Sequence, residues 1–378
     1  MKLIHLSDLH LGKRVNDYSM IEDQDYILRK ILQIIDAEQP RGVIIAGDVY
    51  DRAVPSAEAV QLFDNFLYWL ASRKLQVFII SGNHDSPERI AFGGRLMDLS
   101  GVHLSPVYRG TVEPILLSDE YGEAAVYMLP FIKPATVRGF FAEDEIVSYT
   151  DAVAAAIAHM EIDPSRRNVL VSHQFVTGAE RSDSEELTVG GLDNVDASVF
   201  EPFDYVALGH IHGPQSVGRE TVRYCGTPLK YSFSEKDHVK SVTVVELGGK
   251  GDVSVRTVPL EPKHDLRELR GTYDSLMLKS NYEGTKTDDY LHIILTDEED
   301  VPDAMRRLQT VYPNLMVLDY DNTRTRTTSE IIGAEDVERK SEVELFGALY
   351  ELQNGQPMSE EQQAFAASLF EQIKEETR

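Results

Sequence analysis

The pattern of apolar and polar positions over the first half of the chain predicts strands that alternate with helices. Apolar runs rich in Val, Ile and Leu occupy residues 2–7, 42–46, 76–81, 168–172 and 204–208. Apolar side chains recur at helical spacing over residues 21–37, 57–72 and 88–99. This alternation is typical of an α/β sandwich, in which helices cover sheets.

The pattern changes in the second half of the chain. Residues 223–259 are rich in strand-forming side chains, and a hairpin is predicted from 241–247 and 252–258. Pro259 and Pro262 mark a predicted boundary. A small α+β unit is then expected, with strands at 290–296 and 315–320 and helices near 274–279 and 302–311. A polar linker at 322–329 and two helices at 335–353 and 359–376 follow, which predicts three parts: residues 1–260, 263–321 and 330–378.

Composition narrows the class of protein. The 378 residues are 42% hydrophobic, and no apolar run reaches the roughly 18 residues that a membrane-spanning helix needs. The single Cys225 excludes an intrachain disulfide, which is typical of the reducing cytosol. We therefore expect a soluble, cytoplasmic protein without a signal peptide and without a membrane partner.

Polar residues with metal-binding or proton-transfer chemistry follow five of the predicted strands. These residues are Asp8, His10, Asp48, Asn83, His84, His173, His210 and His212. Because ligand sites of α/β sheets lie at the carboxyl ends of strands, the five motifs are expected to face one crevice. In an extended conformation, Asp8 and His10 would point to the same side of the chain.

These residue types together predict a centre for two metal ions. Carboxylate, imidazole and amide oxygen ligands suit a divalent transition metal. The two oxygens of Asp48 could bridge two cations about 4 Å apart, and His84 would remain free for proton transfer. Each motif alone is also compatible with a tight turn or a buried polar residue. Their joint occurrence, in order and each at a strand end, favours the metal centre.

The motifs resemble those of a known family. Asp8-Leu9-His10, Gly47-Asp48-Val49-Tyr50-Asp51, Gly82-Asn83-His84-Asp85, His173 and Gly209-His210-Ile211-His212 are similar to the signature of calcineurin-like metallophosphoesterases. Within that superfamily they resemble the SbcD branch, the bacterial relatives of the Mre-type double-strand-break nucleases. The resemblance implies a β-sandwich flanked by helices, a small α+β capping domain and a C-terminal helical tail. Asp51 stands where other relatives often carry histidine, and no catalytic role is assigned to it.

The resemblance also implies a role for each site residue. Asp8, His10 and His212 would bind one metal, Asn83, His173 and His210 the other, and Asp48 would bridge them. His84 would act on the scissile phosphodiester, with Asp85 as a residue that could orient it. Two divalent ions, Mn²⁺ in this family, would support a 3′ to 5′ exonuclease on duplex ends and an endonuclease on single strands and hairpins. The family works in DNA repair, recombination and replication.

Charge raises the question of partners. A formal net charge of −26 should repel DNA, so local positive charge or a basic partner is needed. The resemblance implies docking of an SbcC-type ABC ATPase with a coiled coil on the tail, through apolar faces that include Leu345, Leu349, Phe365 and Leu369. The alternative is that the tail packs back on the capping unit.

The resemblance further implies a homodimer. It would be built from two apolar stripes, Ala59, Leu62, Phe63 and Phe66, and Ile90, Phe92, Leu96 and Leu99. Both stripes could equally be core.

Two other functions remain open at this point. A phosphomonoesterase or small-molecule phosphodiesterase of the same superfamily would use the same metal centre. A DNA-tethering scaffold with a vestigial site is the alternative from a different class.

Overall fold

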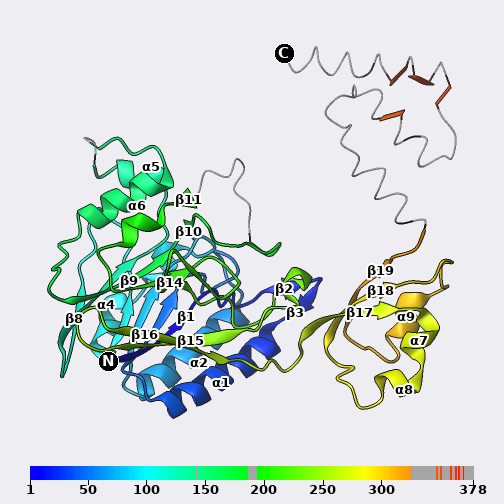
Figure 1. Ribbon diagram of the computed structural model, residues 1–378, viewed down its shortest axis with the longest axis horizontal. Helices are drawn as coiled ribbons and strands as arrows, with labels where there is room; N and C mark the ends of the chain where they lie inside the picture. Colours follow the sequence, from blue (N-terminus) through cyan, green and yellow to red (C-terminus); the bar gives the residue numbers. More distant parts are fainter. Residues whose placement is uncertain are drawn as a thin grey trace. The chain divides into compact units, whose positions relative to one another are not determined.

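The computed structural model of the chain describes residues 1–141, 144–185 and 194–323. It also describes positions 325, 346, 347, 350, 358, 359, 362, 363, 365, 366 and 369. Two six-stranded sheets and the helices that cover them make up most of the described chain (Figure 1).

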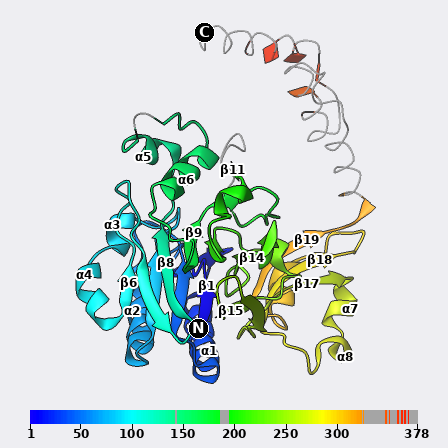
Figure 2. The same ribbon diagram turned by 60° about the vertical axis from the view of Figure 1, so that its left-hand side comes forward.

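The first sheet has the strand order β16-β15-β1-β4-β5-β6. Its strands are β1 Lys2–Leu6, β4 Gly42–Ala46, β5 Gln76–Ile80, β6 Val102–Leu104, β15 Ser241–Leu247 and β16 Val253–Pro259. β1, β4, β5 and β6 run parallel, and β15 pairs antiparallel with β1 and β16, so the predicted hairpin closes one edge. Helices α1 (Ile21–Glu38) and α2 (Ala57–Ser72) lie side by side along this sheet, as both views show (Figures 1 and 2).

The second sheet has the order β13-β14-β12-β9-β8-β7. Its strands are β7 Ile115–Asp119, β8 Gly122–Leu129, β9 Arg167–His173, β12 Tyr205–Gly209, β13 Gln215–Val217 and β14 Arg219–Tyr224. β8, β9, β12 and β14 run parallel. Helices α5 (Pro134–Arg138) and α6 (Tyr149–Ala158) cover its outer face, and Ser148 and Asp151 form a capping box at the start of α6. The sequence patterns did not locate β7, β8, α5 or α6 individually.

Three apolar layers hold this arrangement together. The cluster between the two sheets includes Leu3, Ile44, Phe78, Val171 and Ala207, each 0% exposed. The other two clusters lie between each sheet and its helices. Because both faces of the central strands are buried, these strands are apolar throughout instead of alternating with polar residues. The predicted helix-flanked β-sandwich is therefore confirmed.

The first apolar stripe, on α2, belongs to this core. Ser56 caps the helix by accepting a hydrogen bond from the main-chain N–H of Ala59 at 3.3 Å. Ala59, Leu62, Phe63 and Phe66 are all buried within the chain. This stripe is not available for contact with a second copy, so its interpretation as core is the correct one.

The second stripe differs, because the continuous helix expected over residues 88–99 does not form. The chain instead makes α3 (Pro87–Ile90), α4 (Gly94–Met97) and the short 3-10 turn η1 (Asp98–Ser100). Gly93, at φ 74°, adopts a left-handed conformation at the start of α4 and separates it from α3. Ile90 is buried, whereas Phe92, Leu96 and Leu99 are 83%, 76% and 87% exposed.

Residues beyond the sandwich form a three-stranded sheet in the order β17-β18-β19. Its strands are β17 Leu266–Gly271, β18 Tyr290–Leu295 and β19 Leu315–Tyr320, with helices α7 Tyr273–Met277, α8 Lys279–Tyr282 and α9 Ala304–Leu308. α9 is shorter than the helix expected over 302–311, and β17 was not predicted. The chain divides into two compact units, one comprising Met1–Arg270, Asp274–Ile293 and Asp303–Leu318, the other Gly271–Tyr273, Ile294–Pro302 and Asp319–Arg378.

The remaining elements are short. They are β2 Arg14–Val15, β3 Tyr18–Ser19, β10 Phe175–Val176, β11 Asn194–Val195, η2 Ala197–Phe200 and η3 Phe233–Glu235. The two helices predicted in the tail lie almost wholly outside the described residues. In the part of the chain that is described, no helix combines the length and apolar character needed to cross a membrane. The expected cytoplasmic location stays a prediction.

Candidate metal centre

The predicted site residues meet where strands of both sheets end. Main-chain hydrogen bonds tie the loop after β1 to the loop after β4, from Asp8 N–H to the Gly47 carbonyl (3.0 Å) and from His10 N–H to the Asp48 carbonyl (2.9 Å). On the second sheet, Gly209 at the end of β12 pairs with His173 at the end of β9. The five motifs therefore come together as the strand-end argument predicts.

The backbone at these strand ends is unusual. Asp8, His10, Asp48 and His210 have φ values of 52°, 44°, 49° and 102°, in the left-handed region that non-glycine residues seldom adopt. The extended conformation expected for Asp8 and His10 is therefore wrong. Each such residue costs on the order of 1 kcal/mol or more, and such conformations cluster at functional sites.

Glycines in three motifs allow the loops to approach one another. A Cβ atom on Gly209 would lie 1.9 Å from the Ala46 carbonyl oxygen, and one on Gly82 would lie 2.1 Å from Asp48 Oδ1. On Gly47 it would lie 2.4 Å from His173 Nδ1. Any larger residue would force these segments apart, so the glycines are needed for the side chains to converge.

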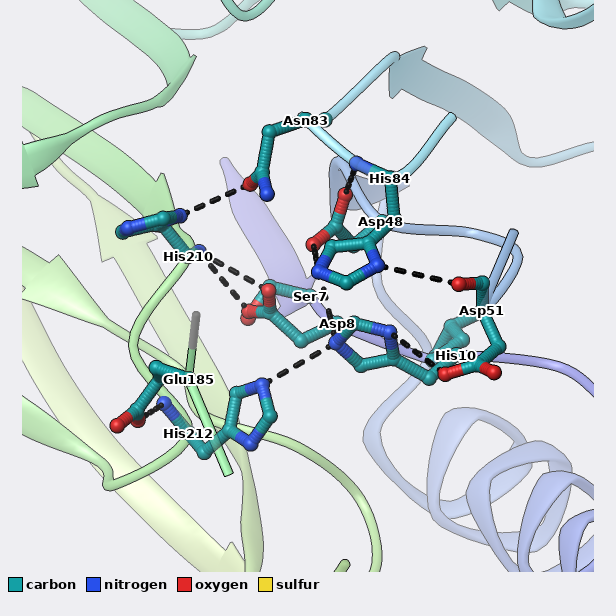
Figure 3. A network of polar contacts seen from close by, with 12 residues as sticks. Ser7, Asp8, His10, Asp48, Asp51, Asn83, His84, Glu185, His210 and His212 are labelled. Carbon is teal, nitrogen blue, oxygen red and sulfur yellow. Dashed lines mark hydrogen bonds and ion pairs between the residues drawn. The ribbon is translucent and has the colours of Figure 1, made fainter. Parts of the chain in front are cut away.

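Asp8, His10 and His212 form a first group of potential ligands. One ligand atom from each lies within 4.8 Å of the others, and all three residues are buried. The Nε2 atoms of His10 and His212 face each other at 3.2 Å (Figure 3). Two imidazole nitrogens and a carboxylate oxygen are thus directed at one small volume.

Asn83, His173 and His210 form a second group. The side-chain oxygen of Asn83 lies 2.9 Å from His173 Nε2 and 2.9 Å from His210 Nδ1. Figure 3 shows the second of these contacts. An amide oxygen and two imidazole nitrogens converge here.

Asp48 lies between the two groups. Its Oδ2 is 3.7 Å from His10 Nε2 in the first group and 3.4 Å from His173 Nε2 in the second. Its Oδ1 accepts a hydrogen bond from the main-chain N–H of His84 at 2.9 Å. The carboxylate is therefore placed where a bridging ligand would stand.

The charges of the site fit divalent cations. Burial, reinforced by the nearby charge of Asp48, raises the pKa of Asp8 to about 6, although His173 acts in the opposite direction. Burial also holds the pKa of His10 well below its usual value. In the described part of the chain, the ion pairs recorded for Asp48 involve histidines alone. Buried carboxylate oxygens close to imidazole nitrogens match the ligand chemistry of divalent transition metals.

His84 is placed differently from the seven potential ligands. Its ring is partly exposed, and its Nδ1 lies 3.1 Å from the main-chain carbonyl oxygen of Asp51. Donation from Nδ1 to that carbonyl leaves Nε2 free, 4.0 Å from Asp48 Oδ2. This ring sits at the rim of the centre, as expected for a group that meets a substrate.

Asp85 does not orient His84 directly. Its buried carboxylate accepts main-chain hydrogen bonds from Val49 (3.1 Å), Tyr50 (3.0 Å) and Gly82 (2.9 Å). It thus joins the loop after β4 to the loop after β5 and acts on the site through the backbone. The hydrogen-bond partner of the His84 ring is the main-chain carbonyl of Asp51, whose carboxylate forms an ion pair with Lys13 at 2.9 Å.

Sequence reasoning missed a group of polar residues behind His212. Ser184 Oγ lies 2.7 Å from His212 Nδ1, and Glu185 accepts a hydrogen bond from His212 N–H at 2.7 Å. The buried Glu235 and Lys240 lie beyond Ser184. None of these residues follows a predicted strand, so no local pattern marked them.

Known proteins are similar to this chain over most of its length. The model of the calcineurin-like phosphoesterases matches residues 1–214, and that of the type 5 capsule protein repressor C-terminal domain matches residues 262–354. The SbcD component of the nuclease SbcCD from Staphylococcus epidermidis is 33% identical over 343 residues, or 89% of this chain and 90% of that protein. The corresponding protein of Staphylococcus saprophyticus is 34% identical over 322 residues, or 84% of each chain.

A solved structure of a dimetal phosphatase from Danio rerio aligns with a TM-score of 0.42 at 10% identity, covering 69% of this chain and 98% of that one. The family assignment comes from the sequence matches, because a phosphoesterase model covers more than half of the chain and both Staphylococcus proteins align with most of it. The chain belongs to the SbcD family of calcineurin-like phosphoesterases.

Proposed function

We propose that the chain is the nuclease component of an SbcCD-type complex and cleaves DNA phosphodiester bonds with two divalent metal ions. The observation that carries this proposal is the position of Asp48, whose Oδ2 lies within 4 Å of a histidine nitrogen from each ligand group. The similar Staphylococcus proteins are named as parts of a nuclease, which supports DNA as the substrate.

The proposed site residues bind different metal ions. Asp8, His10 and His212 would hold one metal ion, Asn83, His173 and His210 the other, and Asp48 both. Two divalent ions at this position supply positive charge for the phosphoryl oxygens and lower the pKa of an attacking water. The left-handed loops and close glycine contacts hold these ligands in place before substrate binds.

His84 is proposed as the residue that acts on the substrate. Its Nδ1 proton is directed at the Asp51 carbonyl, so the ring orientation is set by the backbone. When the ring carries a second proton, on Nε2, that N–H would stabilise the phosphate or pass its proton to the leaving oxygen. The partial exposure of the ring supports this role, because a substrate must be able to reach it.

We further propose Mn²⁺ as the metal, duplex ends, single strands and hairpins as substrates, and an SbcC-type ABC ATPase as the partner. The mixed oxygen and nitrogen ligand set supports a transition metal over Mg²⁺ or Ca²⁺. The net charge of −26 supports a partner that supplies basic surface for DNA. Docking of that partner on residues 330–378 rests on the sequence alone.

One comparison of substrates tests the proposal against its alternatives. Hydrolysis of a linear duplex and of an aryl phosphate would be measured with and without Mn²⁺, and with and without the ATPase and ATP. We expect Mn²⁺-dependent cleavage of DNA. Hydrolysis of the aryl phosphate alone would indicate a phosphomonoesterase, and cleavage of neither substrate would indicate a tethering scaffold.

We also propose a homodimer, now restricted to the second apolar stripe. Phe92, Leu96 and Leu99 are exposed and close together in the chain, whereas the α2 stripe is core. Substitution Leu99→Glu should shift light scattering at micromolar concentration from dimer toward monomer. A wild-type protein that is monomeric under these conditions would contradict the dimer and leave the metal centre unaffected.

A further inference from the structure

A chain of buried polar contacts leads away from the outer nitrogen of His212. Its Nε2 faces the first ligand group, and its Nδ1 lies 2.7 Å from Ser184 Oγ. Ser184 Oγ in turn lies 2.5 Å from Glu235 Oε1. The other carboxylate oxygen of Glu235 forms an ion pair with Lys240 Nζ. The contacts therefore run from the metal-facing ring to a buried carboxylate and then to a buried cation.

Only one arrangement of protons satisfies all of these contacts while His212 binds a metal. A ligating imidazole uses the Nε2 lone pair, so the proton of the neutral ring must be on Nδ1. That proton is donated to Ser184 Oγ, and the hydroxyl proton of Ser184 is donated to Glu235. The ionised carboxylate of Glu235 can only accept hydrogen bonds. Glu235 therefore makes each donor in this series of contacts point from His212 toward itself.

Lys240 keeps Glu235 ionised in the interior. Glu235 is 0% exposed and Lys240 5%. The ion pair between Lys240 Nζ and Glu235 Oε2 gives the buried carboxylate an opposite charge in direct contact. Lys240 also donates to the His212 carbonyl (2.9 Å) and to Thr227 Oγ1 (2.7 Å). Each proton of its ammonium group has an acceptor, which is the condition for burying such a charge.

The other histidines of the centre have no comparable support. His173 Nδ1 lies 2.8 Å from the Ala46 carbonyl oxygen, a main-chain group. Among the described residues, His10 Nδ1 and His210 Nε2 have no hydrogen-bond partner, and His10 Nδ1 lies 3.9 Å from Asp51 Oδ1. Among these histidines of the centre, His212 is therefore the one whose outer nitrogen has a side-chain hydrogen-bond partner in the described residues.

We propose that Ser184 and Glu235 are positioning residues that hold His212 in its metal-binding tautomer and strengthen the site formed by Asp8, His10 and His212. This inference rests on the proposed two-metal function. Segment 182–185 is held in place independently of His212, because Asp183 N–H donates to Ser234 Oγ at 3.1 Å. Partners of this kind raise the basicity of the ligand and fix its ring.

The primary test is the substitution Ser184→Ala, which removes both hydrogen bonds of the Ser184 hydroxyl and leaves the Glu235–Lys240 ion pair intact. His212 Nδ1 then keeps only its long contact of 3.4 Å with Glu235 Oε1. Binding of Mn²⁺ to metal-free full-length protein would be measured by equilibrium dialysis. The wild type should bind two ions. In Ser184→Ala, affinity at one site should fall by about 10-fold to 100-fold while the other site is unchanged. The melting temperature of the metal-free variant should stay close to that of the wild type.

Three further variants separate positioning from general damage. Ser184→Thr keeps the hydroxyl group and should restore wild-type affinity. Ser216→Ala, at an exposed serine of β13, should bind both ions normally. Glu235→Gln should weaken the same single site as Ser184→Ala, and this variant counts only if its metal-free form remains folded by circular dichroism.

The outcomes distinguish this inference from the proposed function. Two ions bound with wild-type affinity by Ser184→Ala would overturn the positioning role and leave the two-metal function standing. Equal weakening of both sites would also overturn it, because the effect would not be specific to His212. A wild-type protein that binds no Mn²⁺ would overturn the proposed function and the inference together.

Discussion

The loops after β1, β4 and β5 on the first sheet and those after β9 and β12 on the second hold their ligands by different contacts. On the first side of the centre, formed by the loops of the first sheet, carboxylates accept hydrogen bonds from main-chain N–H groups. Asp85 joins two of these loops, and Asp48 accepts a hydrogen bond from the N–H of His84. On the second side, imidazole rings are oriented through their outer nitrogens, by Ala46 for His173 and by Ser184 for His212.

The difference shows two ways of building a rigid site. Loops of the first side are joined to one another through their main-chain N–H groups, from which Asp85 and Asp48 accept hydrogen bonds across 36 residues. Rings of the second side depend on contacts across 127 residues for His173 and 28 residues for His212. Substitutions on the first side should therefore affect the loops as a whole, and substitutions on the second should affect single ligands.

The largest effect is expected from Asp48→Ala, because Asp48 contacts both sides. This variant should lose both metal ions and all detectable nuclease activity, since one carboxylate serves both groups and also accepts the His84 N–H. Elemental analysis and cleavage of a linear duplex would measure the two losses. The exposed Asp237 provides a matched control, and Asp237→Ala should keep both properties. Retention of two metal equivalents by Asp48→Ala would contradict the bridging position.

His84→Ala should come next, with cleavage reduced by about 10²-fold to 10⁴-fold and metal content unchanged. The reason is that the partly exposed His84 ring contacts the Asp51 carbonyl through Nδ1, although one of its nitrogens also lies within 4.8 Å of ligand atoms of His10 and Asp48. Single-turnover cleavage rates and elemental analysis would measure this effect. His159→Ala, at an exposed histidine of the second-sheet side, serves as the control. Loss of one metal equivalent in His84→Ala would reassign the residue as a ligand.

Asp85→Ala should lower stability rather than remove a ligand. Three main-chain N–H groups of the first side would lose their acceptor, which costs roughly 1–3 kcal/mol of unfolding free energy for a buried group left unsatisfied. Urea unfolding of the metal-free protein would measure the change. Asp237→Ala again provides the control, and an Asp85→Ala variant as stable as the wild type would show that the loops do not depend on this carboxylate.

The smallest expected effect is a proton released by the second side when metal binds. Burial lowers the pKa of His173, but Asp48 and Asp8 outweigh burial and raise it to about 9 in the metal-free protein. Below pH 9 the ring is therefore protonated, and it must lose that proton to ligate a metal. At pH 7.5 binding should release about one proton from this ring, and affinity should rise with pH until about 9.

Calorimetric titration of Mn²⁺ in buffers with different ionisation enthalpies would measure this release. The number of protons should fall toward zero as the pH approaches 10. No release at pH 7.5 would mean that His173 is already neutral before metal binds, and the influence of Asp48 on the ring would then be weaker than its 3.4 Å distance indicates.

The sequence alone determined the members of the candidate metal centre, because the chemistry of a ligand belongs to its residue type and its place to the strand before it. Asp8, His10, Asp48, Asn83, His173, His210 and His212 could be named from strand-end motifs. The structure brings them close together, with Asp8, His10 and His212 within 4.8 Å of one another and Asn83 in contact with His173 and His210, and their division between two metals stays a prediction. The helix-flanked sandwich could also be predicted from the sequence, since buried parallel strands are apolar throughout.

The tertiary structure decided what depends on residues distant in the chain. Ser184 and Glu235 became visible only when segments 28 and 23 residues away from His212 packed behind its ring. The left-handed backbone of Asp8 and His10 replaced the expected extended one, because hydrogen bonds to the loop after β4 hold it. Packing against the first sheet also assigned the α2 stripe to the core, which periodicity alone could not do, since a buried face and a binding face have the same spacing.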